Sequence, residues 1–349
     1  MEKIILFVGD LNEYGRSLQR YGALIDLGHI VKGISTVPVP WRPIVDSNLL
    51  EKITWKLRLP TDITGANKKI IDMVRQEEFE VIWIEKGNTI RPKTLRLIRK
   101  ISPSSKIVSY SEDDMYAKHN QSLFYKWSLP YYDIVFTTKV YNLVELKSLG
   151  AKRTELILDS YDENLHRPMA LSEEEKKRFS CDVSCIGAFE EDRAMRMLDL
   201  VKRGIKIVVW GNNWGSWVGR HPNLIVKNEH LFKDDYAKAI NATKINLNFL
   251  RKINRDEVTS RSVEIPACGG FMVAERTKRH LDFFREGKEA VFFDTNNELY
   301  GLIKKYLNND ETRKKIAEAG RKRCVESGYS NKIQLQKMLS VVDQIKINL

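Results

Sequence analysis

Apolar residues gather in short continuous runs along the chain, and amphipathic stretches separate them. The first run, Lys3–Val8, ends at Gly9-Asp10 and is typical of a strand that is buried on both faces of a parallel sheet. Apolar positions at helical spacing follow over 14–27. Further strands are predicted at Val81–Glu85, Lys106–Tyr110, Ile134–Thr137 and Leu156–Leu158, with helices such as Arg91–Lys100 and Tyr141–Leu149 between them.

The same alternation continues through the second half. It predicts strands at 182–189, 205–210, 223–228, 245–249 and 290–293, and helices at 235–242, 296–307, 310–326 and 331–347. Alternating strands and helices predict doubly wound α/β sheets, in which ligands bind beyond the carboxyl ends of the strands. The length of 349 residues suits two such domains, and the segment DSYDENLHRP at 159–168 marks the expected boundary.

Composition indicates a soluble globular protein, with 42% hydrophobic and 30% charged residues. No apolar run approaches the roughly 20 residues of a membrane span, and MEKIILFVGDL is too short a segment for a secretory signal. The four cysteines form neither a CxxC pair nor a Cys/His cluster, which predicts reduced thiols in a cytoplasmic protein.

The chain is basic, with a net charge of +12 that is spread over both halves. Nucleic acid, an anionic membrane surface and phosphorylated small molecules are all partners that attract such a charge. A solvated, mildly basic surface explains it equally well. No groove pattern of alternating aromatic and basic residues is evident, so we expect no nucleic-acid partner.

The chemistry concentrates in residues 256–277, DEVTSRSVEIPACGGFMVAERT. A helix is predicted to begin near Thr259-Ser260, whose free N–H groups form a site for phosphate, and to end at Gly269-Gly270. In that helix Arg261 is placed to neutralise a phosphate oxygen, and Glu264 to accept hydrogen bonds from a sugar. Ordinary surface charges and a simple glycine cap are the alternative.

The run SRSVEIPACGGFMVAERT, followed by GKEAVFFDTNNELYGLIKKYLN and AEAGRKRC, resembles the C-terminal domain of the CgeB-like, spore-maturation-type glycosyltransferases. These are similar in turn to the retaining group 1 glycosyltransferases, whose motif is a glutamate, seven residues and a second glutamate. The likeness spans about 130–330 and is strongest over 244–325.

The resemblance implies the α/β GT-B fold, with two Rossmann-like domains facing across a cleft. Residues 1–160 would bind the acceptor, 161–330 the nucleotide-sugar, and the helix of 331–349 would cross back to the first domain. It further implies a retaining mechanism without a metal ion or other cofactor, in which the leaving diphosphate helps to deprotonate the acceptor. Cell-envelope or surface polysaccharide synthesis is the implied context.

The resemblance also assigns residues to the donor. Asp256 stands at the first glutamate of the motif and contacts the sugar, although the adjacent Glu257 leaves the register open, and Glu264 matches the second and contacts the ribose. Ala188 stands where an arginine is usual, so we expect Arg193 and Arg261 to share the diphosphate. Further expected donor contacts are Gly187, Phe189, Gly211, Asn213, Trp214, Asn248, Ala267, Cys268 and Gly269. A buried structural role for Trp214 is the alternative.

Acceptor residues are expected where strands of the first domain end. The candidates are Gly9, Asp10, Tyr14, Gly15, Asp113, Asp114 and His119. A helix cap at Asp113-Asp114 and a surface position for His119 are the alternatives. Residues 38–60 combine Trp41 and Trp55 with basic side chains, which indicates peripheral contact with the inner membrane face or a lipid-linked acceptor. Otherwise the segment is a proline-rich loop packed on its own domain.

The sequence therefore predicts a glycosyltransferase that moves a sugar from a nucleotide-sugar to a glycan or lipid-linked acceptor. A sugar-nucleotide epimerase with the same fold is one alternative, although its usual carboxylates are not recognisable. A basic nucleic-acid-binding protein is the other.

Overall fold

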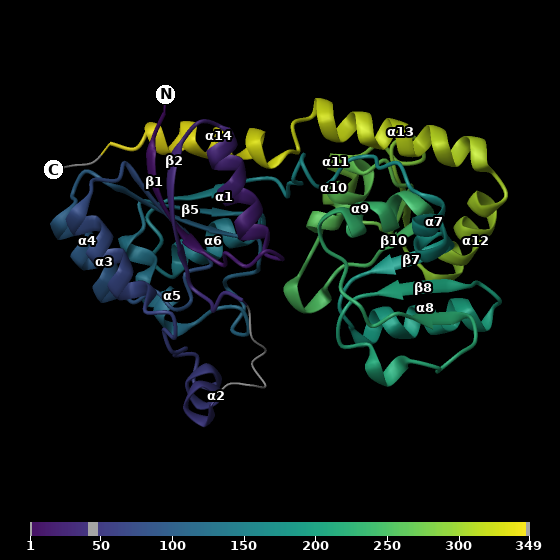
Figure 1. Ribbon diagram of the computed structural model, residues 1–349, viewed down its shortest axis with the longest axis horizontal. Coiled ribbons are helices and arrows are strands. Elements are labelled where there is room, and N and C mark those ends of the chain that lie inside the picture. Colours follow the sequence, from purple (N-terminus) through teal and green to yellow (C-terminus); the bar gives the residue numbers. More distant parts are fainter. Residues whose placement is uncertain (1, 41–47, 347–349) are drawn as a thin grey trace. The chain divides into compact units, whose positions relative to one another are not determined.

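The computed structural model describes residues 2–40 and 48–346 and contains two compact units (Figure 1). The first unit comprises Met1–Leu158 and Asn331–Leu349, and the second comprises Asp159–Ser330. Each unit contains a six-stranded sheet whose strand pairs are all parallel. This is the predicted α/β architecture.

The sheet of the first unit has the order β2-β1-β3-β4-β5-β6. Its strands are β1 (Ile4–Gly9), β2 (Ile30–Ser35), β3 (Val81–Glu85), β4 (Lys106–Ser111), β5 (Ile134–Thr137) and β6 (Thr154–Leu156). Its helices are α1 (Arg16–Asp26), α2 (Leu49–Lys56), α3 (Ala66–Gln76), α4 (Pro92–Ile101), α5 (Leu123–Ser128), α6 (Asn142–Ser148) and α14 (Asn331–Asp343).

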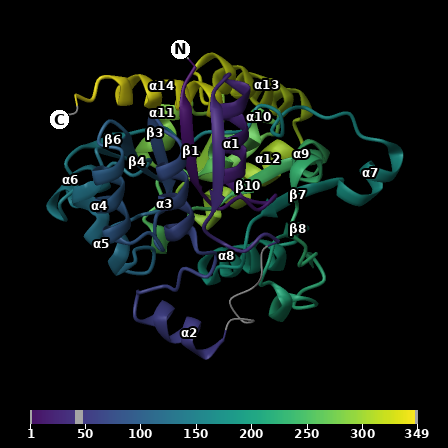
Figure 2. The same ribbon diagram turned by 60° about the vertical axis from the view of Figure 1, so that its left-hand side comes forward.

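Helices cover both faces of this sheet, which explains the continuous apolar runs of its strands (Figures 1 and 2). In β1, Leu6 belongs to a core that includes residues of α3, α4 and α6, whereas its neighbour Phe7 belongs to a core with residues of α1 and α14. Leu335 and Leu339 of α14 are part of that second core. The C-terminal helix therefore belongs to the first unit, as predicted.

The sheet of the second unit has the order β12-β11-β10-β7-β8-β9. Its strands are β7 (Cys181–Ile186), β8 (Ile207–Trp210), β9 (Leu224–Val226), β10 (Thr243–Asn248), β11 (Met272–Glu275) and β12 (Val291–Phe293). Its helices are α7 (Glu173–Phe179), α8 (Glu191–Lys202), α9 (Lys233–Ala242), α10 (Ser260–Ala267), α11 (Lys278–Phe283), α12 (Asn296–Leu307) and α13 (Asp310–Glu326).

The predicted elements agree closely with the structure, with a few corrections. The strand predicted at Leu156–Leu158 lies two residues earlier, because the amide of Leu158 donates to the Gln334 side chain instead of to the sheet. Part of the segment 38–60 is the helix α2 and not a proline-rich loop, although Trp41 lies outside the described residues. The helix predicted to reach residue 347 ends at Asp343.

Candidate functional site

Two arginines of the second unit meet at the carboxyl end of β7. Arg193 comes from the first turn of α8 and Arg261 from the first turn of α10. A methyl group added to Gly187 would lie 2.6 Å from Nη1 of Arg193 and 3.4 Å from Nη1 of Arg261. Backbone carbonyls fix both side chains, since Arg193 donates to Ala188 at 2.7 Å and Arg261 to Phe249 at 3.4 Å.

These two arginines hold positive charge without a negative partner. Their hydrogen-bond acceptors are carbonyl and amide oxygens, and neither forms an ion pair with a carboxylate within the described part of the chain. Arg193 is only 3% exposed, and its Nε has no hydrogen-bond partner among the residues described by the structure. Burial and the like charge of Arg261 lower the pKa of Arg193 below its ordinary value. Such a pair at a helix N-terminus is suited to bind an anion with several oxygens, such as a diphosphate.

Close packing behind Gly187 keeps its loop in place. A methyl group on Gly211 would lie 2.1 Å from the carbonyl oxygen of Gly187, so only glycine fits there. Trp214 donates from Nε1 to the same carbonyl at 2.8 Å, is fully buried and packs against Phe189. Trp214 is therefore a structural residue and not the expected stacking face for a base. Asn213 beside it is exposed.

A chain of buried hydrogen bonds leads from α11 to Arg261. His280 donates from Nδ1 to the Glu275 carbonyl at 2.7 Å, so its Nε2 accepts from Ser262 Oγ, also at 2.7 Å. Ser262 Oγ in turn accepts from Asn248 Nδ2 at 3.0 Å, and Asn248 Oδ1 accepts from Arg261 Nε at 3.4 Å. Burial lowers the pKa of His280 to about 4, which keeps Nε2 an acceptor at neutral pH. A continuous series of hydrogen bonds thus joins His280 to Arg261.

The Glu264 carboxylate is buried on α10 and lies close to two polar side chains, Tyr236 and His166. The Tyr236 hydroxyl donates to Glu264 Oε2 at 2.8 Å, and His166 Nε2 lies 3.8 Å from Oε1. His166 Nδ1 accepts the Asp162 amide at 2.9 Å, so the imidazole proton is on the nitrogen that faces Glu264. Burial and the Glu264 carboxylate raise the pKa of Tyr236 well above its ordinary value, so this donor persists at all working pH values.

The other predicted donor residues lie around α10 with unequal access. Asp256 and Glu257 are half-buried in the loop before the helix. Ala267 and Cys268 are buried, with 3% and 0% of their surface exposed, so their side chains do not offer contacts to a ligand. Gly269 ends the helix with a positive φ of 82°, which is a C-cap geometry.

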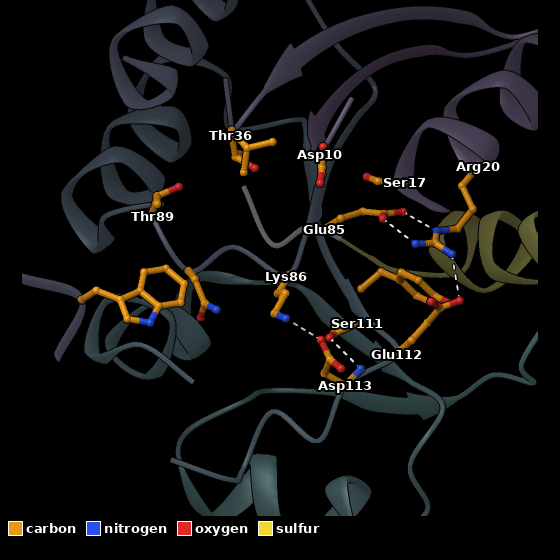
Figure 3. A pocket seen from close by; sticks show the side chains of 14 residues that line it. Asp10, Ser17, Arg20, Thr36, Glu85, Lys86, Thr89, Ser111, Glu112 and Asp113 are labelled. Atoms are coloured by element: carbon orange, nitrogen blue, oxygen red, sulfur yellow. Dashed lines mark hydrogen bonds and ion pairs between the residues drawn. The ribbon is translucent and has the colours of Figure 1, made fainter. Parts of the chain in front are cut away.

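The first unit has a pocket of about 350 Å³ where β1, β3 and β4 end (Figure 3). Arg20 lies on one side of it and donates to both oxygens of Glu85, at 2.6 and 2.7 Å, and to Glu112 at 2.9 Å. Lys86 and Asp113 form a more exposed ion pair at the same strand ends. The pocket therefore contains charges that are already paired.

Of the predicted acceptor residues, Asp10 and Asp113 line this pocket. Asp114 does not, because it is fully buried and its Oδ1 accepts from Asn142 Nδ2 at 2.9 Å and from the Tyr116 amide at 3.2 Å. Asp114 is thus a local cap and not a ligand contact. The remaining candidates lie outside the lining: Gly9, Tyr14, Gly15 and His119.

The sequence did not single out several residues that the structure places at these sites. Ser262 and His280 in the second unit and Arg20 in the first are buried polar residues on helices, and Tyr236 is a half-buried one. The side chains that each of them contacts at these sites lie well apart from it in the sequence, so no local motif marks them. Glu85, by contrast, ends a predicted strand and Glu112 follows another closely. Their positions at strand ends could have marked them as candidate site residues.

In the described ranges no group of three or more His, Cys, Asp or Glu side chains is placed to hold a metal ion. Across those same residues, every helix is too short or too polar to span a bilayer.

Residues 193–340 match the domain family described as glycosyl transferase-like. No curated protein sequence matches the chain. The match does not separate the CgeB-like subfamily from the wider group.

Similar folds occur in solved structures of low sequence identity. Anabaena HepE in complex with UDP and glucose is 12% identical and has a TM-score of 0.65, with 99% of this chain and 100% of that chain covered. Sucrose-phosphate synthase from Thermosynechococcus elongatus is also 12% identical, with a TM-score of 0.67 and coverage of 98% and 99%. A structure described as a UDP-N-acetylglucosamine 2-epimerase from Listeria monocytogenes is 11% identical, with a TM-score of 0.59 and coverage of 98% and 96%. The fold is GT-B, and together with the matched domain it supports a glycosyltransferase.

Proposed function

We propose that this protein transfers a sugar from a nucleoside diphosphate sugar, bound in the second unit, to an acceptor bound in the first. The observation that carries the proposal is the convergence of Arg193 and Arg261 beside Gly187 without carboxylate partners. Two like charges held together in a buried place are costly unless an anion joins them. UDP is the proposed nucleotide, since a structural neighbour was solved with UDP and glucose.

The residues on and around α10 take complementary roles in this proposal. Arg193 and Arg261 hold the diphosphate and stabilise the negative charge that grows on it as the bond to the sugar breaks. Glu264 accepts hydrogen bonds from the ribose hydroxyls, while Tyr236 fixes the carboxylate. Asp256 or Glu257, in the loop before the helix, contacts the donor sugar.

The reaction is proposed to retain the configuration of the sugar and to need no metal ion. The two guanidinium groups supply the positive charge that a divalent cation supplies in other phosphate sites. The acceptor hydroxyl attacks the anomeric carbon, the bond from that carbon to the diphosphate oxygen breaks, and the proton passes to the departing diphosphate. The product class is a surface or cell-envelope glycan.

We also propose that α2 contacts an anionic membrane surface. The helix contains no buried residue and lies away from its sheet in both views (Figures 1 and 2). Leu49, Leu50 and Ile53 are exposed on it, and Lys52 and Lys56 add positive charge. Basic residues near an anionic bilayer each contribute about 1 kcal/mol. Cosedimentation with phosphatidylglycerol vesicles, but not with phosphatidylcholine vesicles, is the expected result, and Leu50→Asp should abolish it.

An epimerase is the second candidate, because a structure described as one shares the fold. The two activities differ in their products. A transferase releases UDP from UDP-sugar only when a new glycosidic bond or hydrolysis occurs, whereas an epimerase converts one UDP-sugar into another.

Proton NMR tests the proposal. The protein is incubated with a vesicle-bound or soluble glycan extract, EDTA and one of three donors, which are UDP-glucose, UDP-galactose and UDP-N-acetylglucosamine. The expected result is UDP release with an α-anomeric product signal, lost in Arg193→Ala and Arg261→Ala and kept in Arg196→Ala. Formation of an isomeric UDP-sugar would establish the epimerase instead, and a strict requirement for added metal would contradict the metal-independent mechanism.

A further inference from the structure

We infer that the pocket of the first unit binds an uncharged sugar ring of the acceptor, and not a phosphate, a carboxylate sugar or a nucleic acid. This inference rests on the proposed function, which leaves the acceptor class open. The pocket volume of about 350 Å³ is at the lower end of the range for small-molecule sites and suits a single sugar residue.

The charges that line the pocket argue against an anionic ligand. Its lining contains the carboxylates of Asp10, Glu85, Glu112 and Asp113 against the cations of Arg20 and Lys86. Both cations are already paired, Arg20 with Glu85 and Glu112 and Lys86 with Asp113. A phosphate would have to displace these carboxylates or lie beside them. In the second unit, by contrast, Arg193 and Arg261 form no ion pair with a described carboxylate, so an anion there would displace nothing.

The pair of Arg20 and Glu112 is also stable towards titration. Burial alone would raise the pKa of the Glu112 carboxyl, but Arg16 and Arg20 hold it well below its usual range. Burial alone would lower the pKa of Arg20, but Glu112 and Glu85 raise it well above its ordinary value. Glu112 and Arg20 therefore both stay charged, and paired with each other, at neutral and mildly acidic pH.

Two hydroxyl groups in the lining have no partner of their own. Ser17 Oγ and Thr89 Oγ1 are buried and form no hydrogen bond with any residue that the structure describes, and Ser17 as a whole is only 6% exposed. They lie on opposite sides of Glu85 and Lys86 in Figure 3. A hydroxyl both donates and accepts, as sugar hydroxyls do, so a ring with hydroxyls along two edges satisfies both. A buried polar atom without a partner is costly, which favours such a ligand.

The remaining wall supplies an apolar surface. Trp55 of α2 lines the pocket and is 52% exposed, so part of its ring is open to a ligand. Sugar rings have one face of C–H groups that packs on an aromatic ring, while their hydroxyls point to the sides. The combination of an aromatic face, paired charges and unpaired hydroxyls fits a neutral pyranose and no other class proposed for the acceptor.

Saturation-transfer NMR of the full chain in the presence of 1 mM UDP tests the inference. The neutral probes are methyl α-glucoside, methyl α-galactoside, methyl α-mannoside and N-acetylglucosamine. The charged probes are glucuronate and glucose 6-phosphate. We expect saturation of at least one neutral sugar and affinities roughly tenfold weaker or worse for the charged ones. Ser17→Ala should weaken the neutral sugar by roughly threefold to tenfold, and Lys86→Ala/Asp113→Ala by roughly tenfold or more.

The matched control is Lys32→Ala/Glu77→Ala, a pair in the same unit with side-chain exposures of 47% and 31% against 49% and 28% for Lys86 and Asp113. It should leave sugar binding unchanged. Three results would overturn the inference. Glucose 6-phosphate could bind more tightly than every neutral probe, no neutral probe could bind, or the control variant could lose as much sugar affinity as Lys86→Ala/Asp113→Ala. UDP affinity is measured in the same samples, so a failed sugar result with intact UDP binding refutes the acceptor class alone, whereas absent UDP binding refutes the proposed function.

Discussion

Arg193 and Arg261 are neighbours of like charge, and each presents an Nη1 atom to the same glycine, Gly187. Neither arginine forms an ion pair with a carboxylate among the described residues, although ion pairs surround the site, such as Arg251 with Glu190 at 2.5 Å. An arrangement of this kind lowers the stability of the empty protein and favours an anionic ligand.

Replacing Arg193 by methionine should therefore stabilise the empty protein while it removes nucleotide binding. The substitution removes a buried charge and keeps most of the side-chain volume, so we expect the free energy of unfolding to rise by about 1 kcal/mol. UDP affinity should fall by about 1.5–3 kcal/mol, because a charge-assisted hydrogen bond is lost. Urea unfolding and calorimetry measure the two effects.

Arg196→Met is the control for that substitution. Arg196 lies on the same helix but pairs with Asp192 at 3.1 Å and is more exposed. It should change stability by no more than about 0.5 kcal/mol and leave UDP binding intact. A loss of stability above about 1 kcal/mol in Arg193→Met would show that the arginine is structural.

Gly187→Ala should block the arginine pair directly. The added methyl group would lie 2.6 Å from Arg193 Nη1, so the guanidinium must leave the Ala188 carbonyl. We expect UDP to bind roughly tenfold more weakly or worse. Gly301→Ala in α12 is the control, because nothing lies within 4 Å of the added atom and a helical Gly→Ala change stabilises by up to about 1 kcal/mol. Equal UDP affinity in both variants would contradict the site.

His280 should make the protein less stable as the pH falls. Its folded pKa of about 4 lies below the ordinary 6.5, so the unfolded chain binds the proton first. The stability is complete above about pH 6.5, is lost progressively as the pH falls towards 4, and changes little further below it. The linkage is worth about 3 kcal/mol.

Urea unfolding of wild type and His280→Gln between pH 7 and pH 4 measures that linkage, because the difference between the two curves removes the contributions of the other groups. The gap between the variants should shrink by about 3 kcal/mol as the pH falls over this window. A constant gap would mean that His280 titrates normally. UDP affinity of His280→Gln should also fall if His280 orients Arg261 through Ser262 and Asn248.

Tyr236→Phe should relax the preference for a complete ribose. Without the hydroxyl, the Glu264 carboxylate loses the 2.8 Å hydrogen bond that fixes Oε2. We expect the ratio of UDP to 2′-deoxy-UDP affinities to fall by about fivefold, which corresponds to about 1 kcal/mol. Tyr306→Phe serves as the control, as Tyr306 is a buried tyrosine elsewhere in the second unit. An unchanged ratio in Tyr236→Phe would place the ribose elsewhere.

Hydrophobic periodicity predicted the order of elements and most of their bounds, because each strand and helix must present apolar residues to a core. The bounds of α12 and α13 were predicted without error for this reason. The proximity of Arg193 and Arg261 was expected from the family likeness, because Ala188 stands where an arginine is usual.

Other features depend on packing that the sequence does not display. Trp214 follows a strand like a ligand-binding residue, but Phe189 and Trp217 enclose it. Asp113 and Asp114 are adjacent, yet one lines the pocket and the other is a buried cap. His280 acquires its role only through Ser262 on another helix.

The most direct test of the central claim is a thermal-shift panel of UDP, GDP, dTDP, ADP and CMP with wild type and Glu264→Ala. A ligand at about 100 times its Kd adds roughly 2.7 kcal/mol of stability. We expect a clear shift with UDP, little with CMP, which has no diphosphate, and loss of the UDP shift in Glu264→Ala. No shift with any nucleoside diphosphate, or an equal shift in the variant, would contradict a nucleotide site built on α10.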